Sequence, residues 1–372
     1  MPQPLTHYLV LRRAIPEKYW SSWWIPEYKN YFALGTAAPD IFYFPTVPKI
    51  VKNIRDDIAW NEIANPLHSN GSYNLFCTLL DAAKLSKNRN SKLANKFFAF
   101  AIGYYAHVIT DCIFHPYVYR NTDDLWCTTD FSNELSHKKF EYLIDCSLRT
   151  LYEKTVKFSH IEWACNDNDE IEEDSCTHQH HKLDSQLADY FNKALLKIYP
   201  DLYPSEQNPD NIYHPLQQAY DAMIQSIQGL FENKYIILFG ARKIIKKLDS
   251  CKDTSFFDSP IPKIKILPQH TPRDLFNFSC ESVQRVFSAA LDYWNNDTAR
   301  SSNKFFSLPE NATNYIGNGN WNLDTGLYCS YNNYMGLREE NLSDHYAYKA
   351  EQLIEIYQSL KSQYDPNHFP AL

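Results

Sequence analysis

Hydrophobic residues recur every three or four positions along much of the chain, which is the spacing of one face of an α-helix. In the segment 74–85, Leu75, Leu79, Leu80 and Ala83 follow this spacing and predict an amphipathic helix. The segment 93–114 is almost continuously apolar and predicts a helix buried on most of its circumference, with its end before Pro116. The same pattern predicts further helices over 134–154, 183–198, 211–249, 272–296 and 343–363.

Three stretches lack this periodicity. Repeated prolines in the first sixty residues predict an irregular segment whose helices are limited to short pieces such as 7–14. Residues 166–181 are rich in acidic residues and histidine and are interpreted as a solvated surface loop. Residues 301–337 are expected to form a long irregular loop.

The composition agrees with a helical protein. Only 9 of the 372 residues are glycine, which argues against barrels, sandwiches and Rossmann folds, because their turns are rich in glycine. The expected fold is therefore an all-α, multi-helix bundle. We expect a helical domain over 1–250 and a helical C-terminal extension over 251–372. Because there is no run of about 18 apolar residues, no transmembrane helix is expected.

Charge and cysteine content argue against two further classes of protein. The net charge of −8 argues against a protein that coats nucleic acid, so no nucleic-acid partner is expected. Nine cysteines without a C-x-x-C pair favour free thiols in a reducing compartment over a disulfide framework. No signal peptide is visible, so a cytoplasmic location is expected, with export by a route that needs no signal peptide as the alternative.

One helical segment carries a pattern typical of a metal site. In GYYAHVITDCIFHP, residues His107, Asp111 and His115 are four residues apart and share one face of a helix. The two histidines are separated by about 12 Å along the helix, which is too far for one ion and suits two or more adjacent ions with Asp111 between them. The alternative is a set of satisfied polar residues in the core.

A second helical segment repeats this spacing. In ELSHKKFEYLID, residues His137 and Glu141 lie one turn apart, so an imidazole and a carboxylate can bind the same ion. Asp145 continues the same stripe. A solvated helix face would also explain this pattern. Two facing helices with ligands at this spacing can build a multinuclear site inside a bundle.

The order and spacing of these motifs resemble the zinc-dependent phospholipase C superfamily, which includes single-strand-specific nucleases. The resemblance covers about residues 1–160. It also includes Thr6-His7-Tyr8, the segment LGTAAPDI with Asp40, and NPLHSNG with His68. It implies an all-helical fold around two or three Zn²⁺ ions. The implied ligands are Asp40, His68, His107 and Asp111 for one ion, His115, His137 and Glu141 for a second, and His7, Asp111 and a terminal amine from Pro2 for a third.

The same resemblance implies hydrolysis of a phosphodiester bond. The expected reaction is release of a phosphorylated headgroup and diacylglycerol from a glycerophospholipid, with Asp40 orienting or deprotonating the attacking water. The expected partners are the phospholipid substrate and, transiently, a membrane surface. The alternatives are a single-strand nuclease or nucleotidase that uses the same zinc cluster, and a non-catalytic interaction protein with structural zinc.

Two further groups of residues allow a lipid-facing or a structural interpretation. Trp20, Trp23 and Trp24 fall between two of the implied ligands, where they would either contact lipid or pack over the metal core. A cluster of basic residues would either attract anionic lipid or form a solvated connector. These basic residues are Lys84, Lys87, Arg89, Lys92 and Lys96.

Overall fold

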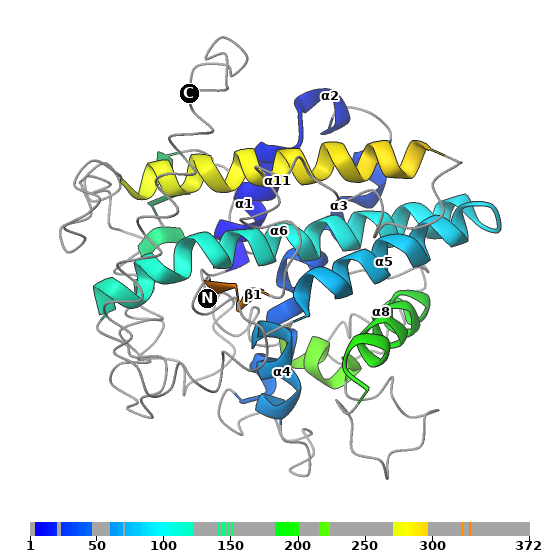
Figure 1. Ribbon diagram of the computed structural model, residues 1–372, viewed down its shortest axis with the longest axis horizontal. Coiled ribbons are helices and arrows are strands. Elements are labelled where there is room, and N and C mark those ends of the chain that lie inside the picture. The colour runs from blue at the N-terminus through cyan, green and yellow to red at the C-terminus, as the bar shows by residue number, and fades with distance from the viewer. Residues whose placement is uncertain are drawn as a thin grey trace, which may run out of the picture.

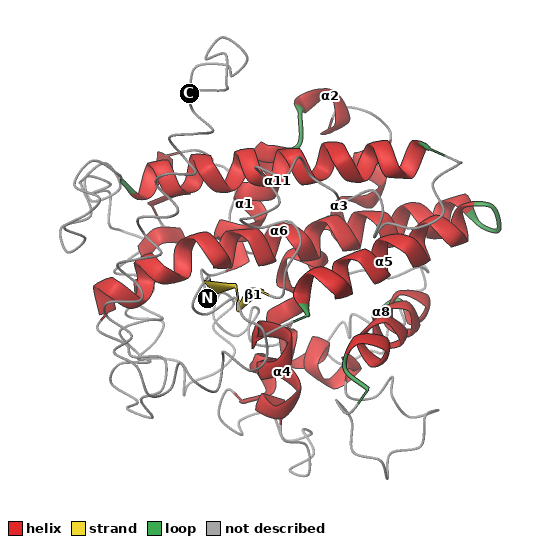
Figure 2. Cartoon of the chain, in the orientation of Figure 1, coloured by secondary structure: helices red, strands yellow, loops and turns green. Residues whose placement is uncertain are grey.

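The computed structural model is almost entirely helical over the residues that it describes (Figures 1 and 2). These are residues 4–20, 24–46, 60–69, 71–122, 140–141, 143–145, 147–148, 150–151, 183–200, 216–223, 271–296, 321–322 and 327–328. The described architecture confirms the predicted all-α fold. The predicted helix over 343–363, the acidic loop 166–181 and most of the predicted helix over 211–249 lie outside the described residues.

Helices of very different length follow one another along the chain. The elements are α1 (Pro4–Ala14), α2 (Glu17–Trp20), α3 (Trp24–Ala37), the 3₁₀ helix η1 (Ala38–Thr46), α4 (Trp60–Ser69), α5 (Ser72–Lys87), α6 (Ser91–Thr122), α8 (Ser185–Ile198) and α11 (Pro272–Asn295). Two short strands, β1 (Trp321–Asn322) and β2 (Leu327–Tyr328), pair in antiparallel fashion. They fall inside the segment 301–337, which the sequence predicted to be irregular, and β1 lies next to α4.

The longest helix, α6, runs through the middle of the bundle (Figure 1). Helices α3 and α5 pack along it, and α1, α8 and α11 also contact it. Its stretch Ser91–His115 is long and apolar enough to cross a membrane, but the most apolar part of this stretch is completely buried inside the protein. Burial from all sides is the environment that the sequence predicted for this helix.

The prediction of an irregular N-terminal segment was wrong. Four helical elements occupy the described part of the first 46 residues, and α3 alone has 14 residues. The prolines fit these helices because Pro4, Pro26 and Pro39 each lie in the first turn of an element. The backbone N–H that proline lacks has no intrahelical partner in a first turn.

Helix α6 also continues beyond its predicted end. It passes through Pro116 and ends at Thr122. Proline removes one hydrogen bond from the helix, at residue 112. Phe114 and Val118, on either side of the proline, are both fully buried in the core. We attribute the continuation of the helix to this packing.

Helix α11 is part of the same core. Phe287 lies against Tyr19, and Trp294 lies against Phe98 of α6. Tyr293 donates a hydrogen bond from its hydroxyl to Asp81 Oδ1 of α5 at 2.6 Å. The boundary predicted near residue 250 lies outside the described residues and stays a prediction.

Two lysines of α5 hold the C-terminal end of α11. Lys84 Nζ donates to the carbonyl oxygens of Tyr293, at 2.6 Å, and of Asn296, and Lys87 Nζ donates to that of Trp294 at 3.0 Å. The last carbonyl groups of a helix have no intrahelical donor and carry partial negative charge, so lysines stabilise this end. These two lysines therefore have a structural role within the bundle.

Candidate metal centre

The predicted ligands of α6 lie together in the core. His107, Asp111 and His115 are each 0% exposed. Asp111 Oδ2 lies 2.8 Å from His107 Nε2, and Asp111 Oδ1 lies 3.6 Å from His115 Nε2. The four-residue spacing in the sequence thus brings one carboxylate between two imidazoles on a single helix face.

Two residues from other elements complete a group around His107. Asp40 comes from η1 and His68 from the last turn of α4. Asp40 Oδ1 lies 2.9 Å from His68 Nε2 and 3.5 Å from His107 Nε2. Each of Asp40, His68, His107 and Asp111 offers one potential ligand atom, and these four atoms lie within 4.8 Å of one another.

Backbone carbonyl groups orient the two histidines of this group. His107 Nδ1 lies 2.7 Å from the carbonyl oxygen of Thr36, and His68 Nδ1 lies 3.1 Å from that of Ala64. When Nδ1 donates to these carbonyls, Nε2 of each neutral ring presents a lone pair to the centre of the group. Such outer contacts fix the tautomer and the ring direction of histidines that bind metals.

A close helix crossing brings the Thr36 carbonyl to His107. Gly35 of α3 and Gly103 of α6 meet at this crossing: a Cβ on Gly35 would lie 2.3 Å from the carbonyl oxygen of Phe100, and one on Gly103 would lie 2.2 Å from that of Phe32. Any side chain at either position would push the helices apart. These two glycines therefore set the distance between Thr36 and His107.

A second set of residues meets the other side of Asp111. His7 Nε2 lies 3.3 Å from Asp111 Oδ1, the oxygen that also faces His115. Glu141 Oε1 lies 3.7 Å from His115 Nε2. The two oxygens of Asp111 consequently face different histidines, which is the arrangement expected of a carboxylate that bridges two ions.

Asp145 has a contact that the sequence pattern did not indicate. Its Oδ1 accepts hydrogen bonds from the backbone N–H of Thr6, at 2.9 Å, and from the Thr6 hydroxyl. Burial raises the pKa of Asp145 well above its usual range, and these two hydrogen bonds oppose that shift. Asp145 thus joins the helical turn of Glu141 to α1 beside His7. Its place one turn after Glu141 was visible in the sequence, but its partner, 139 residues away, was not.

The pKa values of the two stacked histidines are shifted in opposite directions. The rings of His7 and His107 lie 3.9 Å apart with an interplanar angle of 10°. Burial and the neighbouring His107 lower the pKa of His7 well below its usual value. Burial also lowers the pKa of His107, but Asp111 and Asp40 outweigh it and raise this pKa to about 9. In the metal-free chain at neutral pH, His107 therefore carries the proton.

Asp111 has the environment of a carboxylate that binds a cation. Its two oxygens are completely buried, and the described groups that they pair with are imidazole nitrogens. Burial raises the pKa of this carboxyl, whereas His107, His115 and His7 together lower it well below its usual range. A buried carboxylate is costly, and a cation offsets that cost. Imidazole and carboxylate are also ligands that Zn²⁺ prefers.

The remaining predicted site residues are described only in part. Trp20 packs against Phe32, and its indole N–H donates to the carbonyl oxygen of Arg12 at 2.9 Å, which is the packing role that the sequence also allowed. Trp24 begins α3, but its side chain is not among those described. Pro2, Trp23 and His137 lie outside the described residues, so their predicted roles stay predictions.

Comparison with known proteins identifies the family of the chain. No curated protein and no solved structure matches it significantly. The family model described as zinc dependent phospholipase C matches residues 6–230, more than half of the chain and a span that includes every buried residue of the candidate centre. The chain belongs to the zinc-dependent phospholipase C family.

Proposed function

We propose that this protein is a phospholipase C that hydrolyses the phosphodiester bond of glycerophospholipids and releases diacylglycerol and a phosphorylated headgroup. The observation that carries the proposal is the buried group of Asp40, His68, His107 and Asp111 in a member of this family. Two carboxylates and two oriented imidazoles form a donor set that suits zinc. Bound zinc lowers the pKa of a coordinated water and stabilises negative charge on phosphoryl oxygens.

We assign the zinc ligands to three groups, and Asp111 belongs to two of these groups. His68 and His107 bind through Nε2, because their Nδ1 atoms face backbone carbonyl oxygens. Asp111 would be shared by two of the groups, because its oxygens face different histidines. Two or three ions are proposed in total. The groups are Asp40, His68, His107 and Asp111; His115, His137 and Glu141; and His7 and Asp111 with the terminal amine of Pro2.

Asp40 is the residue we assign to proton transfer from the attacking water. Its side chain is 5% exposed, whereas those of His68, His107 and Asp111 are 0% exposed. Asp40 is therefore the member of this group that keeps contact with solvent, and water and substrate are expected to enter beside it. A carboxylate that hydrogen-bonds to the water holds it in place and accepts its proton.

The substitution Asp40→Asn tests this proposal. The amide keeps the size of the side chain and one oxygen that can still contact zinc, but it cannot accept the proton. Cleavage of phosphatidylcholine should therefore fall by about 10²–10⁴-fold while bound zinc is retained. Released phosphorylated headgroup and zinc content per chain are the two measurements. The matched control is Asp292→Asn, which changes an exposed carboxylate on α11 and should leave both values unchanged.

Three outcomes would contradict the assignment. Undiminished cleavage by a zinc-loaded Asp40→Asn variant would remove the proposed role of Asp40. A purified chain without zinc would remove the metal centre itself. Faster release of nucleotides from single-stranded DNA than of headgroup from phospholipid would replace the proposed substrate class by nucleic acid.

A further inference from the structure

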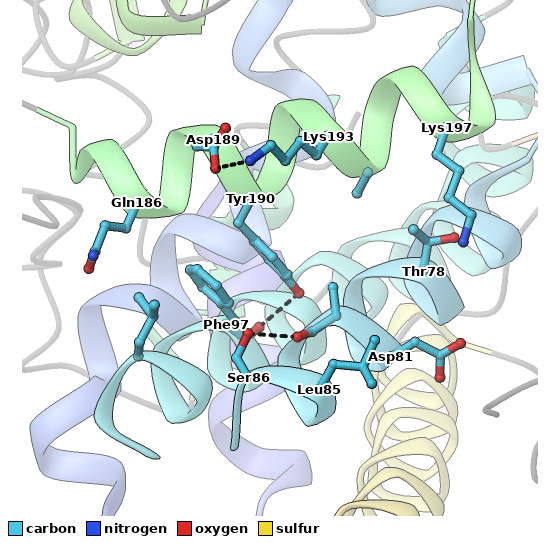
Figure 3. A pocket seen from close by; sticks show the side chains of 13 residues that line it. Thr78, Asp81, Leu85, Ser86, Phe97, Gln186, Asp189, Tyr190, Lys193 and Lys197 are labelled. Carbon is cyan, nitrogen blue, oxygen red and sulfur yellow. Dashed lines mark hydrogen bonds and ion pairs between the residues drawn. The ribbon is translucent and has the colours of Figure 1, made fainter. Parts of the chain in front are cut away.

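A groove separates α5 from α8 at a distance from the metal centre (Figure 3). Its volume is about 440 Å³. The rings of Phe97 and Tyr190 stack at its floor, with centroids 3.8 Å apart. Ala82, Leu85, Leu93 and Ala194 add further apolar surface. The groove meets α6 near Phe97, ten residues or about 15 Å of helix before the first zinc ligand of that helix.

Leu85 gives this groove an apolar tip. It is 76% exposed, and it is the one large hydrophobic side chain with high exposure in the described part of the chain. Leu85 lies near the end of α5, just before the turn that leads into α6. Because leucine prefers an apolar environment, this position gains free energy when a hydrocarbon phase covers it.

Basic side chains lie on both sides of the groove. Arg89 and Lys92 are exposed in the turn and at the start of α6, and Lys193 and Lys197 are exposed along the α8 side of the groove. The acidic side chain that faces these lysines from α8 is Asp189, which pairs with Lys193 at 2.7 Å. Asp81 of α5 also lines the groove, so four cations face two carboxylates and this edge is positive, although the whole chain has a net charge of −8.

The structure separates these cations from other basic residues of the same stretch. Lys84 and Lys87 bind the end of α11, and Lys96 is 5% exposed and lies 3.3 Å from Asp184. The interpretation of the whole basic stretch as a lipid-attracting or solvated segment was therefore wrong for these three lysines. Arg89 and Lys92 are the exposed part of that stretch, and α8 adds two lysines that are distant in sequence.

We propose that Leu85, Arg89, Lys92, Lys193 and Lys197 form a docking surface for an anionic lipid bilayer. The cations bind lipid phosphates, and Leu85 and the apolar groove enter the region between headgroups and acyl chains. Long basic side chains around an apolar element are the pattern of peripheral membrane attachment. The proposal rests on the proposed function for the choice of a lipid surface, and it adds where the protein attaches.

Vesicle binding by the full-length, zinc-loaded protein tests the docking surface. The probes are vesicles of phosphatidylcholine with and without phosphatidylglycerol, followed by co-sedimentation. Each lost cation should weaken binding to the anionic vesicles about fivefold, so the double variant Lys193→Gln, Lys197→Gln should bind roughly 25-fold more weakly. Leu85→Ser should bind about tenfold more weakly. Lys18→Gln, an exposed lysine on α2, is the matched control and should bind like the unmodified chain.

The outcomes separate the docking surface from the proposed reaction. Cleavage of monomeric short-chain phosphatidylcholine needs no bilayer, so it should be equal in all these variants. Loss of vesicle binding with intact cleavage of the short-chain lipid supports docking, as does lysine-dependent binding by a chain that cleaves no phospholipid. Equal binding to both kinds of vesicle, or variants that bind like the unmodified chain, would overturn the docking surface while leaving the reaction untouched.

Discussion

Two buried carboxylates packed near α6 differ in how their oxygen atoms are used. Asp184 caps the N-terminus of α8, and its Oδ1 accepts hydrogen bonds from the backbone N–H groups of Gln186 and Leu187 at 2.9 and 3.1 Å. Its Oδ2 accepts a hydrogen bond from the Tyr31 hydroxyl at 2.8 Å and lies 3.3 Å from Lys96 Nζ. Both oxygens of this carboxylate therefore have partners within the protein.

Asp111 is as deeply buried, but its partners are imidazoles, which are themselves potential metal ligands. Within the described part of the chain, its two oxygens face three imidazole nitrogens, which lie 2.8, 3.3 and 3.6 Å away. A structural carboxylate is satisfied by the fold alone. The carboxylate of a metal centre keeps oxygens available for the ion. The contrast predicts that Asp111 controls zinc binding and that Asp184 controls the stability of the fold.

The largest expected effect is that of Asp111→Asn. Removal of the carboxylate that we propose to be shared by two ions should lower the zinc content by at least one ion per chain. It should also lower phospholipid cleavage by more than about 100-fold, because even residues that only orient a ligand contribute 10- to 100-fold. Zinc analysis and headgroup release are the measurements. Asp184→Asn is the control that should keep its zinc, and an Asp111→Asn protein with full zinc content would refute the distinction.

Lys96→Met tests the other member of the comparison. Removal of the cation leaves the buried Asp184 carboxylate with an unbalanced charge, which should lower the free energy of unfolding by about 3–5 kcal/mol. Chemical denaturation measures this change. Zinc content should not change. Lys193→Met breaks an exposed ion pair and should change stability by less than about 1 kcal/mol. A Lys96→Met protein with unchanged stability would mean that the ion pair between Lys96 and Asp184 does not stabilise the fold.

A smaller effect is expected from pH. In the metal-free chain the pKa of His107 is raised to about 9, and the proton must leave before Nε2 binds zinc. The apparent zinc affinity should therefore rise about tenfold per pH unit until pH approaches 9. Conversely, protonated His107 stabilises the metal-free fold. This contribution to stability is fully present below pH 6.5 and disappears as the pH rises through 9. Calorimetric zinc titrations in buffers of different ionisation enthalpy measure the proton release, and zinc binding at pH 7 without it would contradict the assignment.

The sequence predicted the part of the centre that lies on one helix. Spacing alone places His107, Asp111 and His115 on one face, because the geometry of an α-helix is fixed. Asp40 and His68 come from different elements, and only the resemblance to a family joined them to α6. The prediction of the helical fold succeeded for a similar reason, since amphipathic periodicity is a local property.

Other features depend on contacts between distant parts of the chain, and no local pattern reports them. Lys96 and Asp184 are 88 residues apart, so the sequence allowed Lys96 to be interpreted as an exposed cation. The orienting contact of His107 is with the backbone oxygen of Thr36, an atom that every residue type carries. The N-terminal prolines were misinterpreted because their effect depends on where each helix begins.

The attachment of α11 has a consequence for biosynthesis. Helices α1 and α6 both pack against α11, whose residues 272–295 leave the ribosome long after theirs. Until then, apolar surface that Phe287 and Trp294 later cover, around Tyr19 and Phe98, stays open to solvent. The bundle around α1, which carries His7, is therefore complete only after α11 has been synthesised. A shortened chain that ends with the family-matching region at residue 230 would expose this core surface.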